Sequence, residues 1–141
     1  MLQQQIILEV ATSVRKKMVR VAKDEGFSTD LCGLCLRAST VLHKALSRAG
    51  VKSKLIMGEY GGLEHCWVTV EGTIVDITGT QFGLKAILIA EPGSNAASKY
   101  FQQPTGKKLR DRAALWPIDQ DLRGQIRNLL TTQAQTTRIY T

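Results

Sequence analysis

The sequence of 141 residues has no apolar run approaching the roughly 20 residues that a membrane-spanning helix requires. Its N-terminus lacks a basic segment followed by an apolar stretch, so no secretory signal peptide is visible. Apolar residues make up 43% and charged residues 22%, which excludes wholesale disorder. We therefore expect one cytoplasmic domain over residues 1–141 without membrane contact, with a protein exported by an unmarked route as the alternative.

Cysteine is scarce, and its odd count argues against a disulfide scaffold. Cys32 and Cys35 form a C-x-x-C motif, which is typical of a redox pair, half a zinc site or a catalytic thiol. Zinc would need two more ligands from Cys66, His65 and His43, and no second C-x-x-C exists. A redox motif would follow a strand, whereas the preceding segment has a helical pattern. We expect no metal and no cofactor.

Aromatic residues make up only 6%, and no nucleic-acid-binding motif is present. The formal net charge is nevertheless +7. The basic residues are dispersed, and no tract reaches the five or six like charges of a binding tail. They cluster only briefly, at Arg15-Lys16-Lys17, Lys107-Lys108 and Arg110/Arg112. This pattern favours a solvated basic surface over nucleic-acid binding, and it would suit an acidic protein or peptide partner.

Apolar residues at spacings of three and four predict helices over residues 3–25, 35–49 and 118–134. Gly26 and Gly50 end the first two, as glycines after helices commonly do. Asp119 is placed to cap the third. A loop over residues 27–34 separates the first two helices, so Cys35 is expected in the first turn of the second.

The pattern changes after Gly50 from a helical period to alternation, which is typical of strands. Glu71-Gly72 is expected to be the turn of a β-hairpin. Residues 93–110 are polar and are expected to be irregular. The predicted strands are Val51–Met57, His65–Val70, Thr73–Ile77 and Leu84–Ala90. The order predicts an α+β fold with N-terminal helices packed on a small antiparallel sheet.

A thiol at the start of a helix is favoured as the thiolate, because the free N–H groups and the helix dipole stabilise negative charge. Cys35 meets this condition. Gly33 would let the chain turn tightly or let a substrate approach the backbone, and the Cys35 N–H would contribute to an oxyanion hole. Cys32 is a rival nucleophile, but it lies in the loop and lacks the activation that a helix N-terminus provides. Alternatively, it would form a reversible disulfide with Cys35.

Of the two histidines, His43 lies two turns past Cys35 in the middle of the helix, so no catalytic role is expected. His65 opens a predicted strand, where it can face a thiol on an adjacent helix. The hairpin makes Asp76 a cross-strand neighbour of His65, within reach of a carboxylate–imidazole hydrogen bond. This arrangement is what a Cys-His pair needs in order to hold its ring.

These residues resemble a known group, the transglutaminase-like, papain-like cysteine superfamily. The resemblance spans about residues 33–82, and it rests on Gly33-x-Cys35 opening a helix that ends at Gly50, on Glu64-His65-Cys66-Trp67-Val68 and on Val75-Asp76-Ile77-Thr78. Thr78-Gly79-Thr80-Gln81-Phe82 is similar to small bacterial members, and the cysteine helix and His-x-Trp-Val are similar to the leader peptidases of lasso-peptide biosynthesis. Cys66 departs from the pattern, since many members have alanine there.

The resemblance implies a papain-like core over about residues 27–90. It implies Cys35 as nucleophile, His65 as general base and Asp76 as the orienting carboxylate. The implied enzyme is a hydrolase or acyltransferase on a protein or peptide amide: a cysteine protease, a glutamine deamidase or a transglutaminase. The fold does not choose among these reactions. The alternative is a catalytically inactive binding module with a basic surface.

Further expectations concern the surroundings of the triad. Gln81 would either help to bind an oxyanion or cap a turn. Trp67 is expected to pack behind the histidine, as aromatic residues in strands usually do. Tyr60 and Glu64 are expected to line the approach to the site.

Overall fold

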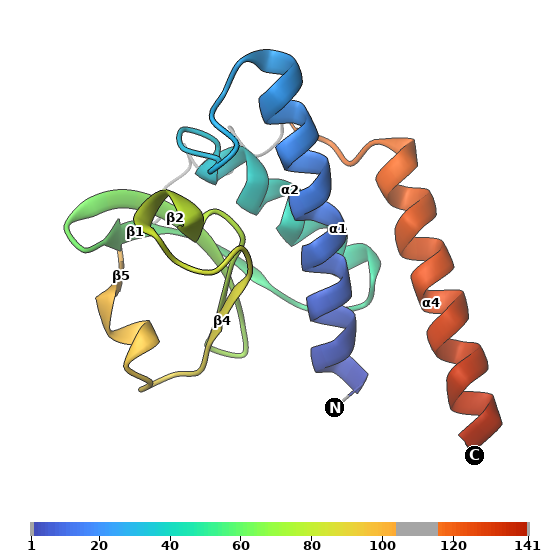
Figure 1. Ribbon diagram of the computed structural model, residues 1–141. Helices are drawn as coiled ribbons and strands as arrows, with labels where there is room; N and C mark the ends of the chain where they lie inside the picture. Colours follow the sequence, from blue (N-terminus) through green and yellow to red (C-terminus); the bar gives the residue numbers. More distant parts are fainter. Residues whose placement is uncertain (1, 104–115, 141) are drawn as a thin grey trace.

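The computed structural model describes residues 2–103 and 116–140 (Figure 1). Within them lie the helices α1 (Leu2–Glu25), α2 (Cys35–Arg48) and α4 (Gln120–Tyr140). The strands are β1 (Lys54–Tyr60), β2 (Leu63–Val70), β3 (Thr73–Asp76), β4 (Leu88–Ala90) and β5 (Tyr100–Gln102), with 3-10 helices η1 (Gly79–Phe82) and η2 (Ala96–Lys99). None of these helices is long and apolar enough to cross a bilayer.

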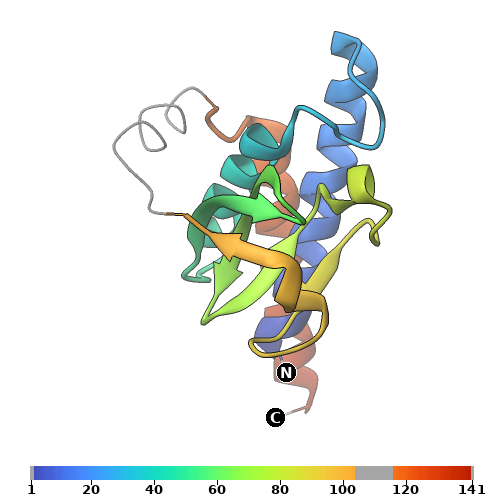
Figure 2. The same ribbon diagram turned by 90° about the vertical axis from the view of Figure 1, so that its left-hand side faces the viewer.

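The strands form one antiparallel sheet in the order β4-β3-β2-β1-β5. Helix α2 packs on β1 and β2, α1 packs on α2, and α4 contacts both helices. Figure 2 shows the sheet in front of the helices, which cover one of its faces. The predicted α+β fold with N-terminal helices on a small antiparallel sheet is therefore confirmed.

The helices form where the sequence pattern places an apolar stripe. The main core cluster lies between these stripes and the sheet, and its fully buried members include Val14, Met18, Leu42, Leu46 and Val68. Burying each such side chain stabilises the fold by about 1.5–3 kcal/mol. Asp119 caps α4 as predicted, since its Oδ1 accepts a hydrogen bond from the Leu122 N–H at 2.9 Å. This core holds α2, and with it the residue that begins α2, against the sheet.

The predicted hairpin is present, because Glu71 and Gly72 both have positive φ values of 50° and 81°. Two such residues make the turn whose twist matches that of the flanking strands. The register pairs Val68 with Val75, so its continuation places Trp67 opposite Asp76. The expectation that His65 and Asp76 are cross-strand neighbours within hydrogen-bonding reach is therefore confirmed. The two residues are diagonal neighbours on the same face, which is still within reach of long side chains.

The predicted boundaries of two strands are wrong. The first strand begins at Lys54 instead of Val51 and continues to Tyr60, where the Gly61-Gly62 turn leads directly into β2. The expected strand over residues 84–90 is reduced to Leu88–Ala90. The chain after β3 forms η1 instead and ends it at Gly83, whose φ of 78° is left-handed. Glycine adopts that conformation without a steric penalty.

The stretch over residues 93–110, expected to be irregular, contains η2 and the edge strand β5. Its residues 104–110, including Lys107, Lys108 and Arg110, lie outside the described residues, as does Arg112. Strand β5 pairs with β1, with Gln102 opposite Gly58. A Cβ atom at Gly58 would collide with the carbonyl oxygen of Phe101. Glycine at this position therefore lets β5 approach and place Tyr100 over the sheet.

Candidate active site

The loop before α2 is shaped so that Cys35 becomes the first residue of the helix. Leu31 is buried with a φ of 68°, and Gly33 has a φ of 84°, so the chain turns sharply twice. The Asp30 Oδ1 accepts a hydrogen bond from the Cys32 N–H at 2.8 Å, which fixes the intervening turn. The tight turn expected at Gly33 is confirmed.

The N-terminus of α2 has no side-chain cap, because the residue before Cys35 is Leu34. An apolar residue there leaves the first N–H groups of the helix without a side-chain acceptor. Those N–H groups and the positive end of the helix dipole would stabilise negative charge on the Cys35 sulfur. Cys35 is half-buried and its thiol is free, so the thiol is accessible and lies in an electrostatic setting that favours the thiolate.

His65 and Asp76 form a buried pair. The His65 Nε2 donates to the Asp76 Oδ2 at 2.8 Å, and both side chains are 0% exposed. The other carboxylate oxygen, Oδ1, accepts hydrogen bonds from the Thr78 N–H at 2.9 Å and from the Thr78 hydroxyl at 3.3 Å. Both oxygens of Asp76 therefore accept hydrogen bonds, and the bond from His65 Nε2 fixes the orientation of the imidazole.

The Cys35 thiol contacts the same imidazole. It is within hydrogen-bonding reach of His65 and of Cys66. Since Asp76 occupies Nε2, Nδ1 is the ring nitrogen left for the thiol. Burial alone would lower the pKa of His65, but hydrogen bonds to Asp76 and Cys35 raise that pKa to about 9. This arrangement favours an imidazolium beside a thiolate.

Two thiols, Cys35 and Cys66, are hydrogen-bonded to each other next to this ring, and their surroundings decide which one ionises. The hydrogen bond from Cys66 and then the contact with His65 lower the pKa of Cys35 to about 5, against the opposing effect of burial. Cys66 is 2% exposed, and its pKa is raised by the hydrogen bond to Cys35 and by burial. These surroundings favour the half-buried Cys35 as the thiolate, with Cys66 as its hydrogen-bond donor.

We expect Cys66→Ala to raise the pKa of Cys35 by about one unit, because the thiolate loses a hydrogen-bond donor. Cys66→Ser is the matched control, since its hydroxyl restores a donor in a similar volume. The measurement is the pH dependence of iodoacetamide alkylation of Cys35, followed by peptide mass spectrometry. An unchanged midpoint in Cys66→Ala would show that Cys66 only fills space.

Gln81 lies on the thiol side of the histidine. Its Nε2 donates to the Thr78 carbonyl oxygen at 3.1 Å and lies 3.5 Å from the His65 Nδ1. It therefore caps the turn at the start of η1, one of the two roles expected for it. The amide thus lies beside the ring nitrogen of His65 that is left for the thiol.

Aromatic rings enclose the imidazole on the outer face of the sheet. Trp67 is 2% exposed, with its ring centroid 6.0 Å from that of His65, so its expected place behind the histidine is confirmed. Phe82 packs edge-on against His65 at 4.9 Å, and Tyr60 stacks on Phe82 at 4.8 Å. Such packing excludes water from the His65–Asp76 pair and strengthens its electrostatics. Glu64 is exposed beside the histidine, as a residue lining the approach would be.

Two residues at the site were missed by sequence reasoning. Tyr100 donates its hydroxyl to the Asp76 Oδ2 at 2.7 Å. Arg15, expected as part of a solvated basic surface, is half-buried. Its Nη1 donates to the Ile77 carbonyl oxygen at 2.6 Å and to the Thr80 hydroxyl oxygen at 3.2 Å. The Thr80 hydroxyl donates in turn to the Asp30 carbonyl oxygen at 2.7 Å. Arg15 thus ties α1 to both loops that carry the site.

The other candidate residues lie outside this constellation. Cys32 is exposed in the loop, and the groups that raise the pKa of His65 are Asp76 and Cys35. His43 is bound to Ser53, with Nδ1 and Oγ 2.6 Å apart. Within residues 2–103 and 116–140, no group of three His, Cys, Asp or Glu side chains is placed to hold a metal ion.

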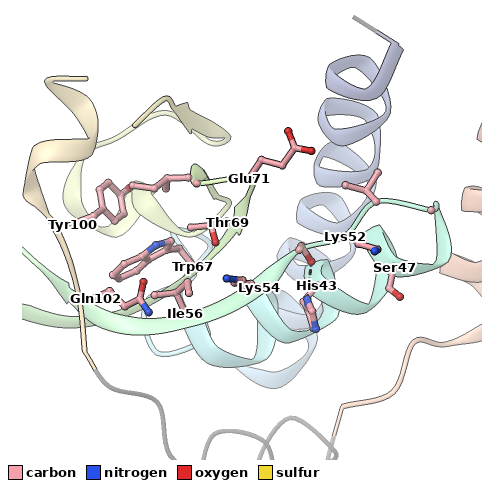
Figure 3. Close-up of a pocket in the computed structure, with 15 residues that line it drawn as sticks. His43, Ser47, Lys52, Lys54, Ile56, Trp67, Thr69, Glu71, Tyr100 and Gln102 are labelled. Atoms are coloured by element: carbon pink, nitrogen blue, oxygen red, sulfur yellow. Dashed lines mark hydrogen bonds between the residues drawn. The ribbon is translucent and has the colours of Figure 1, made fainter. Parts of the chain in front are cut away.

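A groove of about 1020 Å³ lies beside Trp67 and Tyr100 and reaches His43 on α2 (Figure 3). Trp67 and Tyr100 line it, while the Cys35, His65 and Asp76 side chains do not. Lys54 and Gln102 border the same space in the close-up. The groove therefore meets the site through Trp67 and Tyr100, whose rings pack around His65.

The chain matches no family model, no curated protein and no solved structure. The geometry of the site therefore carries the functional assignment.

Proposed function

We propose that the protein is a cysteine-dependent acyl-transfer enzyme of the transglutaminase-like type, acting on a protein or peptide amide. The observation that carries the proposal is the buried His65, bonded to Asp76 through Nε2 and in contact with the Cys35 thiol at the start of α2. The order of these residues on helix, strand and next strand is the order in the resemblance noted from sequence. That likeness supports a papain-like core.

The arrangement supports a complete reaction. The Cys35 thiolate attacks the amide carbonyl carbon, and the C–S bond forms as the carbonyl π electrons move to oxygen. N–H groups at the α2 N-terminus would stabilise that oxyanion, with the Gln81 amide as a further candidate donor. The His65 imidazolium then gives its proton to the leaving nitrogen, the C–N bond breaks, and an acyl-thioester remains.

The thioester is resolved by the same residues. Neutral His65 takes a proton from water as the water oxygen attacks the acyl carbon, and the C–S bond breaks to restore the Cys35 thiolate and the imidazolium. A peptide bond as substrate gives proteolysis, and a glutamine side chain gives deamidation with loss of ammonia. An amine in place of water gives transamidation. The net charge of +7 supports an acidic protein or peptide as the substrate.

The proposal is tested by incubating the protein with a mixed proteome-derived peptide library and an added primary amine. Mass spectrometry reads new termini, glutamine converted to glutamate, and amine adducts. We expect one of these products with the wild type and with Cys32→Ala, and none with Cys35→Ala. Products that persist in Cys35→Ala would refute the assignment. Their absence from every variant, with an unactivated thiol, would favour the binding module.

A further inference from the structure

Asp76 is held by a hydroxyl that comes from the far edge of the sheet. Tyr100 begins β5, is 9% exposed, and donates to the Asp76 Oδ2 at 2.7 Å. The same oxygen accepts the His65 Nε2 at 2.8 Å. Oδ1 is occupied by the two donors of Thr78. The Tyr100 hydroxyl and the imidazole therefore compete for one carboxylate oxygen.

The hydroxyl is not required for the packing of the ring. The Tyr100 ring packs edge-on against Tyr60 and Trp67, at centroid distances of 4.9 and 5.0 Å, and phenylalanine would keep both contacts. Burial and the neighbouring carboxylate raise the pKa of Tyr100, so its hydroxyl stays protonated and acts only as a donor towards Asp76. What the hydroxyl adds beyond the ring is thus its interaction with the charge on Asp76.

We propose that Tyr100 is a positioning residue of this site: its hydroxyl bonds to the same Asp76 oxygen as His65 and reduces the negative charge that this oxygen presents to the imidazole. The inference rests on the proposed function, in which His65 must hold a proton and then release it to the leaving group. A carboxylate facing His65 without this second donor holds the imidazolium more tightly. Tyr100 therefore makes the proton of His65 easier to transfer.

The charged and titratable groups around this pair come from several elements. Cys35 from α2 faces His65, and Arg15 from α1 interacts electrostatically with Asp76. Tyr60 from β1 contacts the His65 ring edge-on, with centroids 6.4 Å apart. It resembles Tyr100 in chemistry and location, and its hydroxyl makes no hydrogen bond to Asp76 among the described residues. Tyr60→Phe is accordingly a matched control for Tyr100→Phe.

The test is the titration of His65 followed by NMR of ¹⁵N-histidine-labelled protein. The signals of His43, the other histidine of the chain, are identified with a His43→Gln variant. We expect Tyr100→Phe to raise the His65 midpoint by about half a pH unit, and Tyr60→Phe to leave it unchanged. A midpoint that is unchanged or lowered in Tyr100→Phe overturns the inference.

A second variant, for which the opposite shift of the His65 midpoint is expected, keeps the test decisive if Tyr100→Phe fails to fold. Difluorotyrosine incorporated at position 100 keeps the shape and is a stronger donor, so it should lower the His65 midpoint. No shift, or an upward one, contradicts the inference. The proposed function fails separately, through an unactivated Cys35 and no Cys35-dependent turnover in the wild type, whereas the inference fails through the His65 midpoint in the Tyr100 variants.

Discussion

In a His65→Ala variant, turnover of any amide substrate is expected to fall by about 10²–10⁴-fold, because the leaving nitrogen loses its proton donor. The same change removes the positive charge beside the thiolate. The pKa of Cys35 should therefore rise from about 5 by about two units. The hydrogen bond from Cys66 remains in this variant, so the rise stops short of the full difference from an ordinary thiol.

Alkylation of Cys35 by iodoacetamide shows this shift without a substrate. At pH 5 the variant should react about fivefold more slowly, because the loss of ionised thiol outweighs the higher nucleophilicity of its thiolate. At high pH it should react faster than the wild type, since thiolate nucleophilicity rises with the pKa of the thiol. The two pH profiles should therefore cross. His43→Ala is the control for a histidine remote from the thiol, and superimposable profiles for His65→Ala and the wild type would contradict the account.

Substitution of Asp76 should have the largest effect on stability. In Asp76→Ala, the buried His65 Nε2, the Tyr100 hydroxyl and the Thr78 N–H all lose their acceptor. We expect the free energy of unfolding to fall by about 3–5 kcal/mol, as when one partner of a buried charged pair is removed. Denaturant unfolding measures this change, with Asp24→Ala on the exposed surface of α1 as control. A loss below about 1 kcal/mol would contradict the buried pair.

Asp76→Asn separates the charge of the carboxylate from its role as acceptor. The amide oxygen still accepts hydrogen bonds, so this variant should be clearly more stable than Asp76→Ala. The pKa of His65 should nevertheless fall from about 9 towards its ordinary value of 6.5, because the opposing charge is gone. Since the sign of the shift is downward, the imidazolium–thiolate pair is lost at a lower pH than in the wild type. An unchanged His65 titration would show that Asp76 does not hold the proton.

Local patterns in the sequence predict much of this site. Cys35 begins its helix as expected, because the apolar stripe of α2 and the stop at Gly50 are local signals. Asp76 approaches His65 because the turn at Glu71-Gly72 fixes the pairing of β2 with β3. The turn holds only two residues, which sets the register and makes these predicted cross-strand neighbours diagonal to each other.

Local sequence patterns could not predict that Tyr100 contacts Asp76. Strand β5 has three residues and pairs with β1, some forty positions earlier in the chain, so its formation depends on a non-local contact. The adjacent aromatics Tyr100 and Phe101 in an otherwise polar stretch were the one local signal available. The hydrogen bond between Cys66 and Cys35 was also unpredictable, since it depends on how α2 sits against β2.

The proposed function requires Cys35 to be a thiolate at neutral pH. The most direct measurement is the rate of iodoacetamide alkylation of each cysteine in the unmodified protein between pH 4 and 10, read by peptide mass spectrometry. The account predicts a midpoint near 5 for Cys35, with Cys66 protected in the folded protein. A midpoint near 8.5, the value of an ordinary thiol, would contradict the account and leave the fold without an activated nucleophile.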